Sequence, residues 1–138
     1  ISFSPQKSLS LDSFKNISKE NEIICQEYVE GTMINMYYDN KWRIATRSNI
    51  GADIKFNFET SLTFRDMFLE AFSNAGLEFD MFSKKYSYSF VLQHPENRIV
   101  VPFNKPNLVL TNIYECKNKL LYSFRNNTSI IYSDTKKI

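Results

Sequence analysis

One stretch near the start of the chain holds side chains whose types and spacing could do chemistry. Residues 25–35 read CQEYVEGTMIN, so Glu27 and Glu30 come shortly before Gly31. A glycine lets a ligand approach the backbone closely, and a carboxylate such as Glu30 can accept from a ribose hydroxyl or hold a metal ion. Arg47, farther along, offers a bidentate fork for phosphate. Together these residues could build a nucleotide pocket, or Gly31 could relieve a bulge while Arg47 lies on a solvated face.

A second stretch places another arginine beside a polar loop. Residues 89–103 read SFVLQHPENRIVVPF, and Arg98 lies between the loop and an apolar run. A guanidinium group carries five N–H donors in a fixed geometry, so Arg98 could contact a phosphate or brace the sheet. The alternative is a structural arginine that satisfies carbonyl groups of the loop.

Secondary structure must position these residues, and the first stretch predicts a β-hairpin. Strand-prone side chains run through residues 23–38, and residues 42–47 alternate large apolar and polar side chains with the period of a half-buried strand. Residues 39–41 read DNK and predict a turn, because Asp and Asn tolerate the backbone conformations that turns need. We therefore expect strands over 33–38 and 42–47, with Arg47 at the end of the second.

A helix is predicted over residues 63–74. Thr63 with Asp66 three residues later has the form of a capping box. Gly76 can end the helix in the left-handed conformation. Apolar side chains recur at helical spacing and should form core rather than a platform for stacking bases; they are Phe64, Phe68, Leu69 and Phe72.

The remaining pattern predicts a sheet. Further extended segments are expected at residues 86–92, 99–101, 108–115, 120–124 and 129–132, the last two as a hairpin around Asn126-Asn127. The fold class is therefore α+β, with an antiparallel β-sheet and one main helix packed on it. Residues 1–22 are polar and serine-rich and are interpreted as an N-terminal arm, and residues 23–138 as a single domain.

Size and composition limit the classes of protein that the chain can be. Its 138 residues suffice for one domain with a core, and its net charge of +2 tolerates an anionic partner without demanding one. Two distant cysteines, Cys25 and Cys116, and the single histidine, His94, cannot supply a zinc site. No apolar run approaches the ~20 residues that span a bilayer, so no membrane partner is expected. Abundant Asn, Ile, Lys, Phe and Tyr with only 3 Gly indicate an A/T-rich genome, such as that of a large DNA virus.

The two stretches, in this order and spacing, resemble the nucleotidyltransferase domain of ATP-dependent RNA ligases of the phage type. Tyr28–Asn35 (YVEGTMIN) resembles the first motif of that family, K-x-D/E-G-S/T-L-I-N, with Tyr28 at the position of the lysine. Thr46–Ser48 resembles its basic serine-containing segment, and Asn97–Val100 (NRIV) resembles a later motif. The resemblance covers roughly residues 23–115 and implies an incomplete nucleotidyltransferase fold, similar to the ligase-like proteins of large DNA viruses.

The resemblance also implies a mechanism and a set of site residues. In that family a lysine attacks the α-phosphate of ATP with the help of a metal ion, and AMP then passes to the 5′-phosphate of an RNA. Here Tyr28 stands at the lysine position and Val91 at that of a second acid, and the later motifs E-G-x-V and K-x-K are absent. We expect no catalytic residue and no metal ligand, and ATP and Mg²⁺ as cofactors only if the chain is active. The nucleotide-binding residues that the resemblance implies are Glu27, Glu30, Gly31, Arg47 and Arg98.

Two hypotheses of different classes follow, and they leave open whether the chain is an enzyme. The first is an RNA-ligase-like domain related to RNA end joining, degenerate in this chain, with missing motifs supplied by a further segment or another subunit. The second is a non-enzymatic structural or scaffold protein of a large DNA virus particle or an RNA-processing complex. An unrelated α+β domain with a chance match is a third possibility. The expected partners are RNA, a nucleotide or other protein subunits, in an intracellular location such as the cytoplasm of an infected host or the virion.

Overall fold

The structure is a computed structural model that describes residues 9–17, 28–117, 120–127 and 130–133. Its main helix, α2, spans Phe64–Asn74, and a shorter helix, α1, spans Leu11–Ile17. A 3₁₀ turn covers Phe79–Met81. The strands are β1 (Thr32–Asp39), β2 (Lys41–Ala45), β3 (Tyr86–Gln93), β4 (Asn107–Lys117), β5 (Leu120–Asn127) and β6 (Ile130–Ser133).

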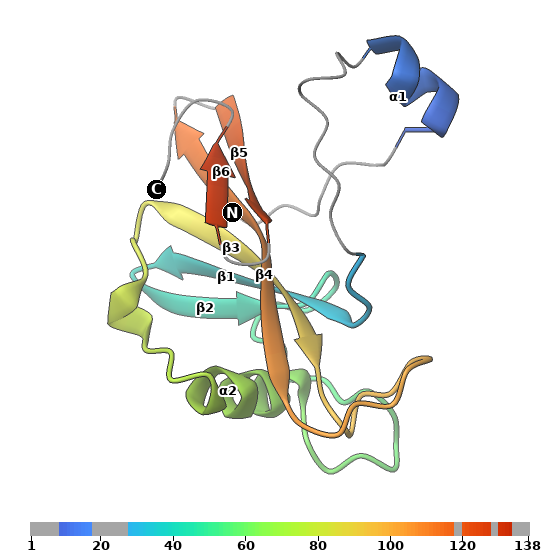
Figure 1. Cartoon of the computed structure of the whole chain (residues 1–138). Coiled ribbons are helices and arrows are strands. Elements are labelled where there is room, and N and C mark those ends of the chain that lie inside the picture. Colours follow the sequence, from blue (N-terminus) through green and yellow to red (C-terminus); the bar gives the residue numbers. More distant parts are fainter. Residues whose placement is uncertain (1–8, 18–27, 118–119, 128–129, 134–138) are drawn as a thin grey trace.

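The strands form one six-stranded sheet in the order β2-β1-β3-β4-β5-β6, and every neighbouring pair is antiparallel (Figure 1). Helix α2 packs against one face of this sheet (Figure 1). The predicted α+β class, an antiparallel sheet with one main helix packed on it, is confirmed for the described part of the chain. The short helix α1 falls within residues 1–22, which the sequence predicts as a polar arm. The proposed boundary between residues 22 and 23 lies outside the described residues, so the division into an arm and a domain over 23–138 stays a prediction.

The predicted hairpin is confirmed, with a first strand longer than predicted and a second strand that begins one residue earlier and ends two residues earlier than predicted. Strand β1 pairs with β2 through a turn at Asn40, which has a φ of 57° that asparagine tolerates. Strand β2 ends at Ala45, so Arg47 lies in the following turn, which the N–H of Thr46 closes by donating to the carbonyl of Asn49 at 2.9 Å. Residues 28–31 are not in a strand, because β1 begins only at Thr32.

The closing hairpin is confirmed, with a first strand that extends beyond the predicted residues 120–124. Asn126 and Asn127, predicted to form the turn, lie in β5 and pair with Ile131 and Ile130 of β6. Residues 128–129, between these two strands, lie outside the described residues.

Helix α2 begins with the predicted capping box. The side-chain oxygen of Thr63 accepts from the N–H of Asp66 at 3.1 Å, and Oδ2 of Asp66 accepts from the N–H of Thr63 at 2.9 Å. The hydroxyl of Thr63 also donates to Oδ2 of Asp66 at 2.7 Å, and this bond together with the one from the N–H of Thr63 holds the pKa of Asp66 below its ordinary value. At the other end Gly76 has a φ of 67°, and its N–H donates to the carbonyl of Ser73, as a left-handed cap requires.

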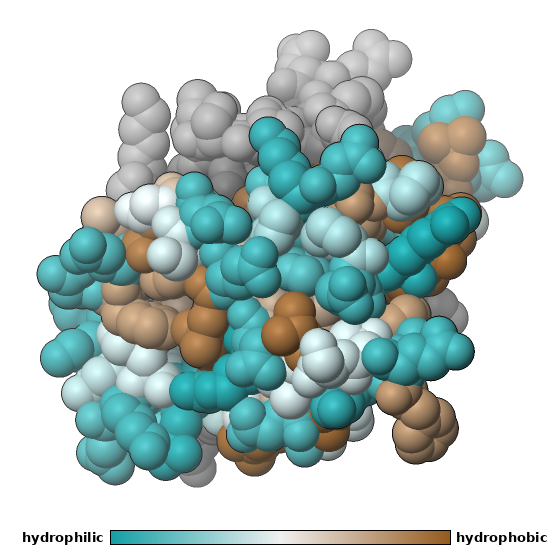
Figure 2. All heavy atoms as spheres, turned by 90° about the horizontal axis from the view of Figure 1, so that it is seen from below, coloured by the Kyte–Doolittle hydropathy of each residue, from teal (hydrophilic) through white to brown (hydrophobic). Residues whose placement is uncertain are grey.

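The predicted phenylalanine stripe forms the core between α2 and the sheet. Phe68 is fully buried, and its ring lies 5.5 Å from that of Phe72 and 5.6 Å from that of Phe90 on β3. The single tryptophan, Trp42 on β2, extends this core with its ring 6.1 Å from that of Phe79. Seen from the side of α2, the surface is mostly hydrophilic with scattered apolar side chains (Figure 2). Among the described residues, no helix has the length and apolar character that crossing a membrane requires.

Candidate functional site

The start of β1 approaches β3 at a distance that only glycine allows. Gly31 has a φ of 151°, and a Cβ added to it would lie 2.5 Å from the carbonyl oxygen of Leu92 and 2.6 Å from Cγ1 of Val91. A Cβ contact under 3.0 Å forces something to shift, and here one of the atoms is backbone. The close contact between two chain segments therefore explains this glycine. A nucleotide-binding role for Gly31 stays a prediction.

The sheet register makes the two stretches of the sequence analysis neighbours. Thr32 pairs with Leu92 and Met33 with Val91, so the YVEGT stretch ends beside the strand that leads into the HPENR loop. Val91 is buried, with 7% of its surface exposed. The position at which the resemblance places a second acid therefore holds an apolar side chain, which cannot accept from a ribose hydroxyl or hold a metal ion.

Asn97 fastens the loop after β3 to the start of β1. It is fully buried, its Nδ2 donates to Oγ1 of Thr32 at 2.7 Å, and its backbone N–H donates to the carbonyl of His94 at 2.9 Å. Its Oδ1 is buried without a hydrogen-bond partner among the described residues. Sequence analysis proposed a role for Arg98 but named Asn97 only within the NRIV match, without a role. The available signal was an asparagine in a polar loop, a residue type whose side chain often bonds locally to the backbone of turns.

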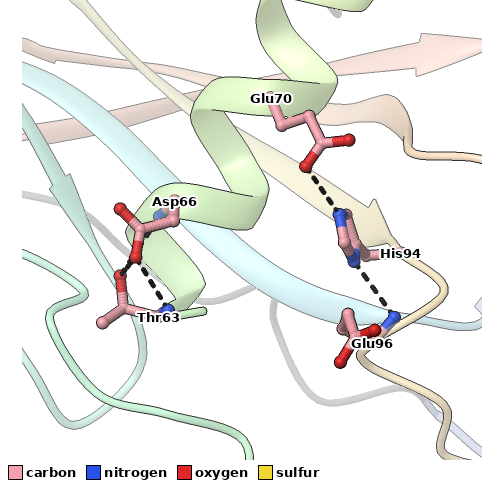
Figure 3. A network of polar contacts seen from close by, with 5 residues as sticks. All are labelled: Thr63, Asp66, Glu70, His94 and Glu96. Carbon is pink, nitrogen blue, oxygen red and sulfur yellow. Dashed lines mark hydrogen bonds and ion pairs between the residues drawn. The ribbon is translucent and has the colours of Figure 1, made fainter. Parts of the chain in front are cut away.

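His94 ties the same loop to α2 (Figure 3). Its buried ring places Nε2 3.3 Å from Oε2 of Glu70, and Nδ1 accepts from the N–H of Glu96 at 3.1 Å. Because Nδ1 accepts from a backbone N–H, Nε2 is the ring nitrogen that can donate to Glu70. The histidine is therefore a structural link between the helix and the loop.

The carboxylate of Glu30 binds two backbone amides farther along the segment between β3 and β4. Its Oε1 accepts from the N–H of Val100 at 2.8 Å and from that of Val101 at 3.2 Å. The prediction of an extended segment over residues 99–101 is wrong for this reason, because these two amides donate to a side chain and join no strand. A role for Glu30 toward ribose or a metal stays a prediction. Among the described residues, no group of three or more His, Cys, Asp or Glu side chains could hold a metal ion.

Tyr28 and Arg98 lie close to this contact in the chain and are exposed. Tyr28 comes two residues before Glu30 and is 95% exposed, and Arg98 comes two residues before Val100. Neither side chain forms a hydrogen bond or ion pair with another described residue. The alternative that Arg98 satisfies carbonyl groups of its loop is therefore not supported within this part of the chain. The Glu30–Val100 bond joins the segments that carry the exposed ring of Tyr28 and the exposed guanidinium of Arg98.

Arg47 lies apart from this group in its contacts. It is exposed and lines an open concavity of about 600 Å³. In the residues that the structure describes, no hydrogen bond or ion pair joins it to Glu30, Gly31 or Arg98. Glu27, the remaining predicted binding residue, lies outside the described residues. The concavity is lined by Tyr37, Tyr38, Asp39, Ala45, Thr46, Arg47, Ser48, Asn49 and Ile50.

Comparison with known proteins finds a likeness to a phage RNA ligase. The chain is 32% identical over 95 residues to an RNA ligase of Rhodothermus phage RM378. Over that part, the chain is RNA-ligase-like. The match covers 63% of this chain and 22% of the ligase, so it spans about a fifth of the length of that relative. No family model matches the chain, and no solved structure matches it.

Proposed function

We propose that this chain is an RNA-ligase-like nucleotidyltransferase domain that has lost covalent catalysis and binds a nucleotide, free or within RNA, without becoming adenylylated. The observation that carries this proposal is the side chain at the lysine position. Tyr28 is 95% exposed there, two residues before the Glu30-Gly31 pair that packs against β3 and its loop. The likeness to a phage RNA ligase supports the family relationship.

The replacements at the chemical positions argue against group transfer. Transfer of AMP to an enzyme of this kind needs an amine nucleophile, and a tyrosine at position 28 supplies none. The described residues also do not fit a site for Mg²⁺. One oxygen of Glu30 already accepts two amide N–H groups, and the buried Val91 offers no oxygen. No step through a metal ion is therefore part of this proposal.

The residues that persist suit binding without chemistry. An exposed aromatic ring such as that of Tyr28 can stack on a nucleobase, and stacking is worth about 1–3 kcal/mol per base. An exposed guanidinium such as that of Arg98 can bind a phosphate through two parallel hydrogen bonds. Both side chains lie within two residues of the bond between Glu30 and Val100.

The test separates covalent labelling from binding. The purified chain is incubated with α-labelled ATP and Mg²⁺ or Mn²⁺, denatured, and examined for retained label, with an active RNA ligase as the positive control. We expect no label on the chain. An acid-labile, base-stable adduct would overturn the loss of covalent catalysis. Fluorescence anisotropy with labelled ATP and with a labelled 5′-phosphorylated RNA measures binding at low salt. Replacement of Tyr28 by alanine should weaken binding by about five-fold or more.

One observation favours the second candidate, a structural or scaffold protein that acts through other protein subunits. Ile99, Val100 and Val101 are three consecutive apolar residues that are 53%, 70% and 47% exposed. Contiguous exposed apolar side chains are typical of protein interaction surfaces. Absence of nucleotide and RNA binding by the folded chain would favour this candidate over the first. Either function would operate within an infected cell or a virus particle if the proposed viral source is correct.

A further inference from the structure

Residues 98–101 keep an unusual conformation for their sequence. Ile99, Val100 and Val101 are β-branched residues, which strands favour, yet they bend at the surface and none of them is buried. A backbone N–H outside a strand still needs an acceptor or water. The acceptor for Val100 and Val101 is one oxygen of Glu30, which lies 70 and 71 residues earlier in the chain. The N–H groups of Val100 and Val101 thus both bond to one side chain from another part of the fold.

Glu30 is itself held at its backbone. Its carbonyl accepts from Nε2 of Gln93 at 2.9 Å, and Oε1 of that glutamine accepts from Nδ2 of Asn107 at 3.1 Å. Glu30 is therefore joined to the end of β3 through its backbone and to the loop through its carboxylate. Because both its backbone and its carboxylate are hydrogen-bonded, Glu30 can fix the position of the loop relative to the sheet.

We propose that Glu30 is a positioning residue that holds the Arg98–Val101 loop beside Tyr28, and that the loop in this position forms part of the nucleotide-binding face. The proposal rests on the proposed function, since it names the loop that meets the bound nucleotide. It also explains why a chain with tyrosine at the lysine position still has the acid two residues later. Glu30 is needed to hold the loop in its conformation, and this role does not require a lysine at position 28.

Two neutral substitutions of Glu30 distinguish a positioning role from direct contact with the ligand. In Glu30→Gln the side-chain amide oxygen can still accept from both N–H groups, whereas in Glu30→Ala it is gone. Hydrogen exchange by NMR reports the amides of Val100 and Val101, and anisotropy with a labelled 5′-phosphorylated RNA reports affinity. Glu78→Ala is the control, because Glu78 is exposed, makes no side-chain capping bond and carries the same charge. Fluorescence of Trp42 confirms that each variant is folded.

We expect Glu30→Ala to raise the exchange rate of these two amides by roughly ten-fold or more, as loss of a hydrogen bond to a charged group predicts. The same variant should weaken RNA binding by about five-fold or more, because a free loop must be ordered on binding. Glu30→Gln and Glu78→Ala should stay within about three-fold of the unsubstituted chain in both measurements, since a neutral acceptor still bonds the amides.

Three other results overturn the proposal in different ways. If Glu30→Gln loses RNA affinity while the two amides stay protected, Glu30 contacts the ligand directly. If Glu30→Ala frees the amides but leaves affinity unchanged, the loop is not part of the binding face, although the proposed function stands. If the unsubstituted chain binds neither labelled ATP nor RNA, the proposed function fails and the binding half of this inference fails with it, whatever the exchange rates show about the loop.

Discussion

Replacing Gly31 by alanine tests the close approach between the start of β1 and β3. The new Cβ would lie 2.5 Å from the carbonyl oxygen of Leu92 and 2.6 Å from Cγ1 of Val91, so the two segments must separate. A φ of 151° adds backbone strain of about 1–3 kcal/mol for alanine, and overpacking adds about 1–3 kcal/mol. We expect a loss of about 2–6 kcal/mol in the free energy of unfolding, the sum of the two terms. For a domain of this size that is a fall in Tm of roughly 8–24 °C.

The matched control is Gly76→Ala. Gly76 also has a positive φ, 67°, but a Cβ there would meet nothing within 4 Å. Only the backbone term applies, so we expect a loss of about 1–2 kcal/mol. Urea unfolding followed by the fluorescence of Trp42, the single tryptophan, gives both values. An equal loss in the two variants would refute the argument, because the steric overlap with β3 would then be absent.

Three further predictions concern the core and the titrating groups. Phe68→Ala removes a fully buried ring that packs against Phe90 and should lower the free energy of unfolding by about 3–5 kcal/mol, measured by urea titration. Because Thr63 lowers the pKa of Asp66, this carboxylate stabilises the folded state above pH 3.8, and the stabilisation is lost as the pH falls through the lowered pKa. Asp66→Asn should remove this dependence on acid pH, as measured by Tm over a series of pH values. Burial raises the pKa of Tyr88 from 10.0 to about 12, so stability should fall as the pH rises through that interval, and Tyr88→Phe should flatten the alkaline limb.

The elements that the sequence predicts well are those encoded by neighbouring residues. Thr63 and Asp66 form their capping box three residues apart, and Phe68 and Phe72 share one helical face. The turn at Asn40 closes a hairpin between adjacent strands. Each of these patterns depends on local geometry, which residue spacing reports directly.

The candidate site is predicted less well because its contacts join residues that are far apart in the sequence. The bond from Asn97 to Thr32 joins residues 65 apart, and nothing near Asn97 in the sequence indicates its partner. Residues 99–101 are predicted as an extended segment, but in the structure they form a bent, exposed loop whose amides at Val100 and Val101 bond to Glu30. Strand propensity describes how a segment fits a sheet, and a distant carboxylate can change that outcome.

The long separation between Glu30 and Val101 has a consequence for the order of folding. The β1–β2 hairpin pairs residues that are few positions apart, whereas the Glu30–Val101 bond closes a loop of 71 residues. Contacts of high sequence separation form after the loops that they close have been shortened by other pairing. We therefore expect the loop at residues 98–101 to assemble only after β1 has paired with β3. During synthesis, a nascent chain that has not yet emerged from the ribosome as far as residue 101 would therefore have a formed β1–β2 hairpin but no assembled loop at residues 98–101.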